Sequence, residues 1–126
     1  MKKIITADTA PAAIGPYSHG NAFGDLIFTS GQLPVCHNSG KIVSDDITEQ
    51  SKKSLENLKA VVEAGGGDMN SVLKTTCYLA NITDFQAFNA VYSDFFQDNC
   101  PARSCFAVKD LPLGALVEIE AIASCK

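Results

Sequence analysis

The sequence has no long hydrophobic run, because its apolar stretches extend for only a few residues before a polar residue interrupts them. A helix that spans a membrane needs about 20 mostly apolar residues, so a membrane-spanning segment is not expected. A secretory signal is not expected either, since the amino-terminal segment reaches an acidic residue, Asp8, before an apolar region can develop. We therefore expect a cytoplasmic protein.

The sequence also has little positive charge. Its 10 lysine and arginine residues are outnumbered by 14 aspartate and glutamate residues, the net charge is −4, and the lysines are spread along the chain. Proteins that neutralise nucleic-acid phosphates usually carry a basic stripe or patch. Binding of nucleic acid is therefore disfavoured. A small anionic substrate remains compatible with this charge, because one arginine can bind it.

Residues that bind metals or act as nucleophiles are few and poorly spaced for those roles. The two histidines, His19 and His37, have no metal-ligand spacing with each other or with a cysteine. The sequence contains neither the Gly-Lys-[Ser/Thr] ending of a phosphate-binding loop nor a G-x-S-x-G elbow. Cys105 as a nucleophile would need a base, and no histidine is expected near it. We expect no metal site and a packed thiol at Cys105.

The five cysteines do not form a disulfide pattern. Their number is odd, no C-x-x-C pair occurs, and they stand at positions 36, 77, 100, 105 and 125. Structural disulfides belong mainly to oxidising compartments. We therefore expect reduced thiols, with Cys77 and Cys105 acting as small hydrophobic residues within strands.

The sequence does contain an ordered series of strand and helix patterns in 126 residues, a length that fits one domain over residues 1–126. Strands are predicted at residues 17–23, 26–30, 72–80, 103–108 and 116–124. Helices are predicted after capping boxes at Asp46 and Thr83. The first ends at the glycines 65–67, and the second carries an aromatic stripe expected in the core. This order predicts an α+β fold in which two helices cover one face of a sheet.

Alternation along the last two strands predicts which residues the helices leave uncovered. Two apolar sets are expected to face the helices: Val117, Ile119, Ala121 and Ala123 in the last strand, and Ser104, Phe106 and Val108 in the strand before it. The uncovered face would then hold Arg103, Cys105, Glu118 and Glu120. Because apolar residues also project there, we expect a second subunit to cover this face. From the pattern alone, Arg103 and Glu118 form either a structural ion pair or a site at a subunit interface.

Six segments together resemble the YjgF/RidA family, which is also called the endoribonuclease L-PSP family. They are Ala10-Pro11-Ala12-Ala13-Ile14-Gly15-Pro16-Tyr17-Ser18, Thr29-Ser30-Gly31-Gln32-Leu33-Pro34, Lys74-Thr75-Thr76, Asn89-Ala90-Val91-Tyr92, Pro101-Ala102-Arg103-Ser104-Cys105 and Val117-Glu118-Ile119-Glu120-Ala121. They follow one another in the order of that family and extend from about Thr6 to Ser124. The resemblance implies a chorismate-mutase-like α+β fold with one mixed sheet and two helices on one face. It also implies a homotrimer with its sites between subunits.

The same resemblance implies an activity and a role for each site residue. It implies a 2-iminobutanoate/2-iminopropanoate deaminase, which hydrolyses reactive enamine or imine intermediates to 2-keto acids and ammonia without a cofactor. Arg103 would bind the substrate carboxylate through two parallel hydrogen bonds, and Glu118 would activate water and transfer protons. The other residues would line the pocket: Tyr17, Ser30, Gly31, Asn89 and Cys105, the last through its backbone and bulk.

Two other functions stay open. Ribonuclease or translation-inhibitor activity is associated with some family members, although the net charge and the lack of a paired-histidine set speak against it here. A non-catalytic trimer that binds metabolites or acts as a chaperone would use Arg103 but has less need of Glu118. Turnover of an imine separates the deaminase from both alternatives.

Overall fold

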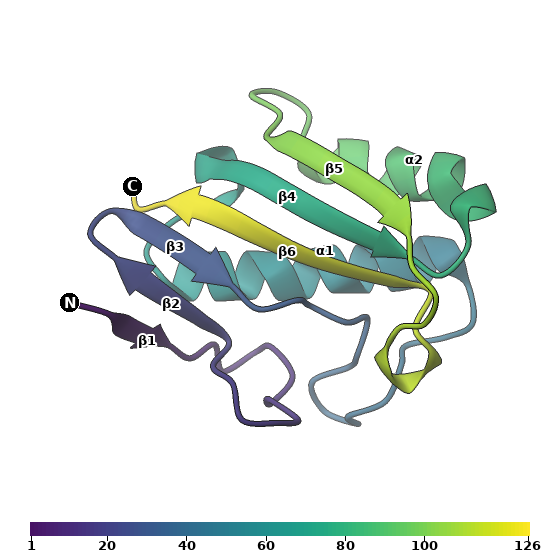
Figure 1. Cartoon of the computed structure of the whole chain (residues 1–126), viewed down its shortest axis with the longest axis horizontal. Helices are drawn as coiled ribbons and strands as arrows, with labels where there is room; N and C mark the ends of the chain where they lie inside the picture. The colour runs from purple at the N-terminus through teal and green to yellow at the C-terminus, as the bar shows by residue number, and fades with distance from the viewer.

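Two helices cover one face of a six-stranded mixed sheet (Figure 1). The computed structural model describes all residues from 1 to 126. The strands are β1 (Lys3–Ile5), β2 (Gly20–Phe23), β3 (Leu26–Thr29), β4 (Val72–Leu79), β5 (Ala102–Ala107) and β6 (Val117–Ser124). The helices are α1 (Ile47–Ala64) and α2 (Phe85–Phe95), with short 3₁₀ turns at Met69–Ser71, Ile82–Asp84 and Pro112–Gly114. The predicted α+β architecture is therefore confirmed.

The strands lie in the order β1-β2-β3-β6-β4-β5, and only the β4–β5 pair is parallel. β2 and β3, two strands that the sequence predicts, form a hairpin in which Gly24 takes a positive φ of 59° in the turn. The chain leaves β4 and passes through α2 before β5, as a parallel neighbour requires. β5 is therefore an edge strand with a hydrogen-bonded partner on one side only.

Helix α1 begins and ends where the sequence predicts. The carboxylate of Asp46 accepts a hydrogen bond from the Glu49 amide at 2.9 Å, so Asp46 caps the first turn. The second bond of the predicted capping box is not formed, because the Asp46 amide donates to the Ser44 hydroxyl at 3.1 Å and not to Glu49. At the other end Gly66 takes a φ of +96°, a conformation that costs a residue with a side chain about 1–2 kcal/mol. The amides of Gly66 and Gly67 then bond to the carbonyls of Glu63 and Val62, which closes the helix in a Schellman motif.

Removing the Asp46 cap should destabilise the fold measurably. We expect Asp46→Ala to lower the free energy of unfolding by about 1 kcal/mol, because one amide of the first turn loses its acceptor. Asp45→Ala is the matched control, since Asp45 is also exposed and accepts no capping hydrogen bond. Urea unfolding of the two variants measures the difference, and equal losses would refute the capping role.

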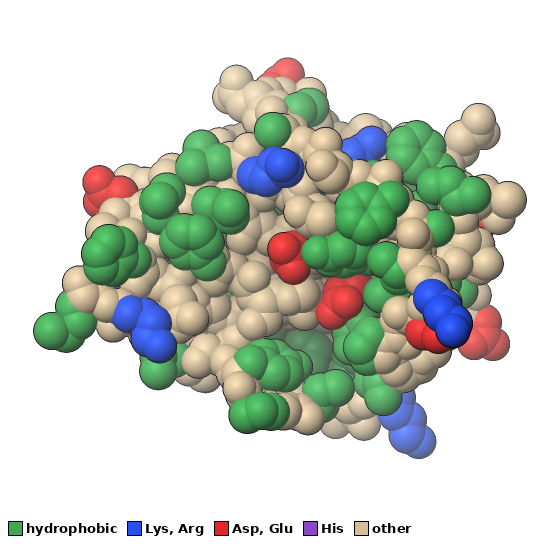
Figure 2. All heavy atoms as spheres, in the orientation of Figure 1, with side chains coloured by type: hydrophobic (Ala, Val, Ile, Leu, Met, Phe, Trp, Pro, Cys, Tyr) green, Lys and Arg blue, Asp and Glu red, His purple; other side chains and the backbone are tan.

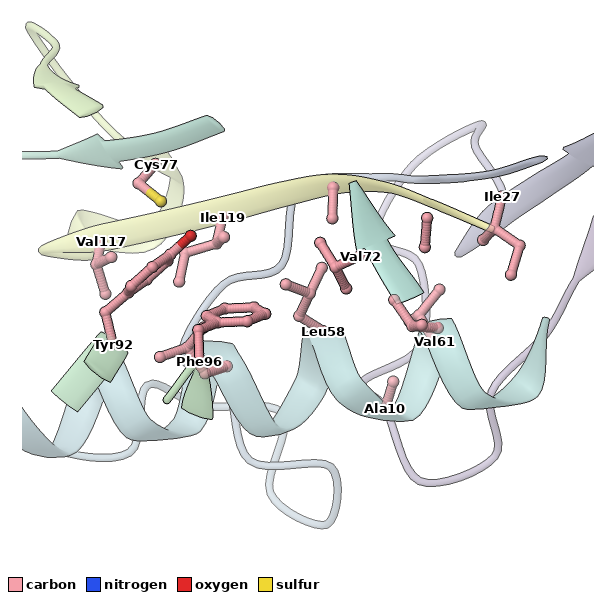
Figure 3. Close-up of a cluster of buried hydrophobic side chains, with 14 of the residues drawn as sticks. Ala10, Ile27, Leu58, Val61, Val72, Cys77, Tyr92, Phe96, Val117 and Ile119 are labelled. Atoms are coloured by element: carbon pink, nitrogen blue, oxygen red, sulfur yellow. The ribbon is translucent and has the colours of Figure 1, made fainter. Parts of the chain in front are cut away.

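Helix α2 differs at its start from the prediction. A 3₁₀ turn at Ile82–Asp84 precedes it, and no side chain caps its first turn, so the capping box predicted at Thr83 is wrong. The aromatic stripe is nevertheless in the core as predicted: Phe88, Tyr92 and Phe96 are buried. Figure 3 shows Tyr92 and Phe96 on the α2 side of the core, below Cys77, Val117 and Ile119 of the sheet. The rest of the core lies between α1 and the sheet, where Leu58, Val61 and Ile27 pack.

The orientation predicted for β5 is wrong. Thr75 and Cys77 of β4 are buried on the helix side, and their register partners in β5 are Arg103 and Cys105. These two residues therefore point to the helix side, whereas Phe106 points to the uncovered face and packs edge-on against Tyr78 at 5.5 Å. The expected grouping of Arg103 and Cys105 with Glu118 and Glu120 on one face of the chain is overturned.

A second departure lies at the start of β4, where strict alternation would place Leu73 on the same buried face as Cys77 and Leu79. The pairing of β4 with β6 shifts between Val72 and Lys74, which marks a β-bulge, and Leu73 is half exposed. The five cysteines are free thiols, as predicted. Neither helix is both long and apolar enough to cross a membrane.

Candidate active site

The uncovered face of the sheet combines apolar and acidic side chains. Figure 2 shows hydrophobic side chains spread over this face, with acidic side chains near its centre and a hollow beside them. The exposed apolar residues on the faces of β3 and β5 that point away from the helices include Leu26, Phe28 and Phe106. Glu118 and Glu120 of β6 lie opposite Tyr78 and Thr76 of β4 and share this face with them. An apolar face that also carries two carboxylates is unusual for a surface that meets only water.

Glu118 lies in a cleft of about 290 Å³ that the uncovered face shares with two loops. The cleft is lined by Ile14, Tyr17, Ser30, Gly31, Leu33, Pro112 and Glu118. Four of the seven residues predicted for the site, Tyr17, Ser30, Gly31 and Glu118, therefore lie together in the structure.

The segment after β3 brings Gly31 against Glu118. Gln32 and Ile119 exchange two backbone hydrogen bonds, of 2.7 and 3.2 Å, which fasten this segment to β6 next to Glu118. A Cβ atom on Gly31 would lie only 2.6 Å from Oε2 of Glu118, so only glycine leaves room for the carboxylate. The hydroxyl of Ser30 is tied back to the Ser18 carbonyl at 2.5 Å, which joins the cleft to the preceding loop.

The environment of Glu118 favours its protonated form. Partial burial raises the pKa of the carboxyl group, and the neighbouring charge of Glu120 raises it further. Burial and Glu120 also raise the pKa of Tyr78, which lies opposite Glu118 on β4. A carboxyl group with a raised pKa in a cleft is a candidate for proton transfer near neutral pH.

Arg103 lies at the opposite side of the sheet, between β5 and α2. Its Nη1 donates a hydrogen bond of 2.7 Å to Oδ1 of Asn89. The guanidinium carbon stands 4.7 Å from the centre of the Tyr92 ring, and the rings of Phe85 and Phe88 follow at 5.5 and 6.0 Å. The guanidinium is therefore surrounded by one side-chain amide and three aromatic rings, and no carboxylate lies beside it.

Arg103 has no ion-pair partner in the chain. The two ion pairs of the structure are Lys53–Glu56 and Lys126–Asp68. The alternative of a structural Arg103–Glu118 ion pair is therefore wrong for the single chain. A guanidinium that is half buried and has only one side-chain hydrogen bond keeps several N–H donors for an external anion.

Cys105 accompanies Arg103 on the helix side of β5, and its register partner is Cys77. Partial burial raises the pKa of the Cys105 thiol, which favours the neutral form. Burial raises the pKa of Cys77 to about 12. These two thiols therefore favour the neutral form, and both pack on the helix side of the sheet.

The seven predicted site residues thus form two sets within one chain. The Glu118 set is Tyr17, Ser30, Gly31 and Glu118, and the Arg103 set is Asn89, Arg103 and Cys105. The sets point to opposite faces of the sheet, so a single chain does not bring them together. The contact of Phe85, Phe88 and Tyr92 with Arg103 was not predicted from the sequence. The sequence pattern that could have predicted this contact is the helical spacing of positions 85, 88, 89 and 92, which puts the three aromatic residues and Asn89 on one side of α2.

A second cavity of about 210 Å³ adjoins the Glu118 cleft and shares Ile14, Tyr17, Gly31 and Leu33 with it. His19 and His37 line this cavity, and both hold loops in place. The His19 ring accepts from the Ala7 amide at 2.9 Å and its other nitrogen lies 2.8 Å from the Pro11 carbonyl. His37 bonds to the Ala10 carbonyl at 3.1 Å. These contacts give both histidines a structural role in the loops.

Known proteins share both the sequence and the fold. The family sequence model described as Endoribonuclease L-PSP matches residues 7–125. The chain is 45% identical over 126 residues to a Salmonella typhimurium protein named 2-iminobutanoate/2-iminopropanoate deaminase, with 98% of each covered. It is 44% identical to E. coli TdcF, solved with bound serine, at a TM-score of 0.94 over 98% of this chain and 99% of that one. It is 42% identical to the YjgF gene product of E. coli, at a TM-score of 0.93 over 98% of this chain and 99% of that one. The chain therefore belongs to the YjgF/RidA family.

Proposed function

We propose that the protein is a deaminase that hydrolyses 2-imino acids, such as 2-iminobutanoate and 2-iminopropanoate, to 2-keto acids and ammonia. The name of the Salmonella relative supports this reaction, and the serine bound to E. coli TdcF supports a small amino-acid-like ligand. The observation that carries the proposal is the pair of complementary sets. One offers an unpaired guanidinium for a carboxylate, and the other offers a carboxyl group with a raised pKa for proton transfer.

Arg103 binds the carboxylate of the substrate in this proposal. The planar guanidinium matches a carboxylate with two parallel N–H···O bonds, which fix the orientation of the substrate as well as its charge. Asn89 accepts from Nη1 of Arg103 at 2.7 Å, and the Tyr92 ring lies against the guanidinium at 4.7 Å. The other N–H donors of Arg103 are then available to the substrate. The substrate is then held at one end, and its C=N carbon is free to meet water.

Glu118 moves protons during the addition of water. Its carboxylate takes a proton from a water molecule while the water oxygen bonds to C2 of the protonated imine, and the C=N π electrons pass to nitrogen. Glu118 then returns this proton to the nitrogen of the tetrahedral adduct. The C–N bond breaks, ammonia leaves, and loss of the hydroxyl proton completes the keto group. Such positioned proton transfer contributes about 10²- to 10⁴-fold, which suffices for an electrophile as reactive as an iminium ion.

The two sets meet between copies of the chain in this proposal. Because Arg103 and Glu118 point to opposite faces of one sheet, a complete site needs the Arg103 set of one copy and the Glu118 set of its neighbour. The apolar residues of the uncovered face, such as Phe28 and Phe106, support a face that a second copy covers. A closed ring of three copies gives three equivalent sites, since each interface joins the same two surfaces.

A ribonuclease has less support from the site. The ring nitrogens of His19 are engaged in loop hydrogen bonds, and the acidic residues Glu118 and Glu120 lie on the uncovered face, where they repel phosphates. A non-catalytic binder would use the Arg103 set alone.

A trapping assay tests the proposal. A pyridoxal-dependent threonine dehydratase supplies 2-aminocrotonate, and semicarbazide competes for the imine that forms from it. We expect the protein to suppress the semicarbazone signal in proportion to its concentration, while free 2-ketobutanoate increases by the same amount. Suppression that requires stoichiometric protein would indicate binding instead of turnover, and no suppression would overturn the deaminase.

Substitution of Gly31 should separate folding from activity. In Gly31→Ala the new methyl group takes the space of the Glu118 carboxylate, which would otherwise lie 2.6 Å away. Because the displaced atoms end a flexible side chain, we expect an unfolding midpoint close to that of the wild type. We also expect turnover to fall by about 10²-fold, as a misplacement of roughly 1 Å can cost that much. Gly40→Ala controls for loss of a glycine, because its added methyl group meets open space; Gly40 has a positive φ, which Gly31 does not, so any backbone strain counts against the control and not against Gly31→Ala. Full activity of Gly31→Ala would contradict the assigned place of Glu118.

A further inference from the structure

A buried hydrogen bond lies directly beneath Arg103. The hydroxyl groups of Thr75 and Tyr92 are 2.7 Å apart, and both side chains are buried. Thr75 is the register partner of Arg103 in the neighbouring strand, so Tyr92 is bonded to the residue beside Arg103 in the sheet. The same Tyr92 ring lies under the guanidinium at 4.7 Å, the shortest of the three ring contacts.

We propose that Tyr92 is a positioning residue for Arg103: its ring, locked by Thr75, sets the plane of the guanidinium so that the free donors meet a substrate carboxylate as a fork. This inference rests on the proposed function and adds a residue to it.

The packing around Tyr92 leaves its ring one orientation. Phe88 and Phe96 flank it with ring centres at 5.6 and 4.7 Å, and Thr75 fixes its outer end. In Figure 3 the Tyr92 side chain extends from α2 toward the underside of the sheet. Burial raises the pKa of Tyr92 to about 12, so the hydroxyl remains protonated and keeps its hydrogen bond at physiological pH. The ring is thus a fixed surface.

A fixed ring matters because an arginine side chain loses much rotamer freedom when it binds. A long side chain at the edge of a sheet would otherwise sample many orientations, and few of them present two parallel N–H donors to one carboxylate. Attraction between the cation and the Tyr92 ring holds one flat face of the guanidinium. The Asn89 oxygen holds Nη1 at 2.7 Å, and together these two contacts define the plane and its rotation.

The chain offers a matched set of variants for the test. Tyr92→Leu removes the ring, and Phe95→Leu removes a half-buried ring of α2 that packs against the core and makes no ring contact with Tyr92 or Arg103. Tyr92→Met also removes the ring but fills more of its space with a flexible side chain, so it replaces Tyr92→Leu in the test if the leucine variant does not fold. Tyr92→Phe keeps the ring without the hydroxyl, and Thr75→Val removes the other half of the hydrogen bond.

The kinetic readout distinguishes positioning from stability. We expect Tyr92→Leu to raise the KM for the imine and the Kd for 2-ketobutanoate by about 3- to 30-fold with little change in kcat, because carboxylate binding is shared by substrate and transition state. Phe95→Leu should leave KM unchanged although it lowers the unfolding midpoint. Tyr92→Phe and Thr75→Val keep the ring but lose the hydrogen bond that locks it, so both should raise KM by less than Tyr92→Leu does. Equal KM values in Tyr92→Leu and Phe95→Leu would overturn the proposal.

A second readout does not depend on turnover. The side-chain Nε–H resonance of Arg103, identified by its absence in Arg103→Lys, should be narrow and shifted upfield by the Tyr92 ring current in the ligand-free wild type. It should move to the position of a free arginine in Tyr92→Leu and remain in place in Phe95→Leu. An unchanged resonance in Tyr92→Leu would refute the positioning role even if the protein hydrolyses no imine. If the resonance moves in Tyr92→Leu but the wild type hydrolyses no imine, the positioning role stands and only the proposed function is refuted.

Discussion

Replacing Arg103 with alanine is expected to lower kcat/KM for a 2-imino acid by about 10²- to 10⁴-fold. This loss corresponds to two charge-assisted hydrogen bonds to the substrate carboxylate, each worth about 1.5–3 kcal/mol. The free chain has no carboxylate that pairs with Arg103, so the substitution breaks no ion pair within the fold. Steady-state kinetics by the trapping assay measures the loss, and calorimetry should show that 2-ketobutanoate no longer binds.

Two companion measurements make the Arg103 result specific. Arg103→Lys keeps the positive charge but loses the planar fork and is expected to recover only a small part of the activity. Lys74→Ala, an exposed cation on the uncovered face of the neighbouring strand, should retain wild-type kinetics if only Arg103 binds the carboxylate. An unfolding midpoint near that of the wild type would show that the fold survives. Wild-type-like turnover by Arg103→Ala would eliminate the carboxylate-binding role.

Replacing Glu118 with glutamine should have an effect of similar size but a different signature. We expect kcat to fall by about 10²- to 10⁴-fold, because the amide cannot accept and return a proton. Binding of 2-ketobutanoate should persist, since Arg103 is intact. The contrast between the two variants therefore assigns one set to binding and the other to chemistry. A Glu118→Gln variant that retained its kcat would exclude proton transfer by this residue. Glu120→Gln is the neighbouring control.

The raised pKa of Glu118 predicts opposite effects of pH on activity and stability. Turnover needs the carboxylate, so it should fall as the pH drops through the raised pKa. The folded chain holds the Glu118 proton more tightly than the unfolded chain does. Its contribution to stability is therefore present at low pH and is lost as the pH rises from the ordinary glutamate pKa to the raised one. A pH–rate profile checks the effect on turnover, and urea unfolding at several pH values checks the effect on stability. Glu118→Gln should abolish the contribution of this group to both pH dependences.

The order and type of the main elements could be predicted from local signals. The Asp46 cap, the glycines after α1 and the turn at Gly24 each reflect a backbone requirement that a short segment satisfies by itself. The stripe of α2 was likewise visible, because its period is that of a helix with one buried side.

The orientation of β5 could not be predicted from local signals. Neither of its alternating sets is uniformly apolar, and an edge strand covered only in part by a helix tolerates a half-buried arginine on the helix side. On that side the Arg103 guanidinium lies against the Tyr92 ring of α2, which stabilises its charge. On the other face Phe106 packs against Tyr78. The bulge at Leu73 was equally hidden, because it depends on the register between β4 and β6.

The candidate site residues came from the resemblance, which did not indicate how one chain divides them between two faces of the sheet. The ordered motifs identified Tyr17, Ser30, Gly31 and Glu118, which the fold brings into one cleft. They also identified Asn89 and Arg103, which the fold joins at 2.7 Å. Sequence order carries no information about how the fold distributes these residues between the two faces of the sheet. If both sets act in one site, as we propose, activity requires the proposed assembly.

Mixing two inactive variants tests the shared site most directly. Arg103→Ala and Glu118→Gln are unfolded together in equal amounts and refolded, mass spectrometry confirms that mixed oligomers form, and imine turnover is measured. If each site joins the Arg103 set of one copy to the Glu118 set of the next, about a quarter of the sites in random mixed rings carry both intact residues. We therefore expect recovery of roughly a quarter of the wild-type activity in the mixture and none in either variant alone. Mixed oligomers that remain as inactive as the separate variants would contradict a site shared between copies.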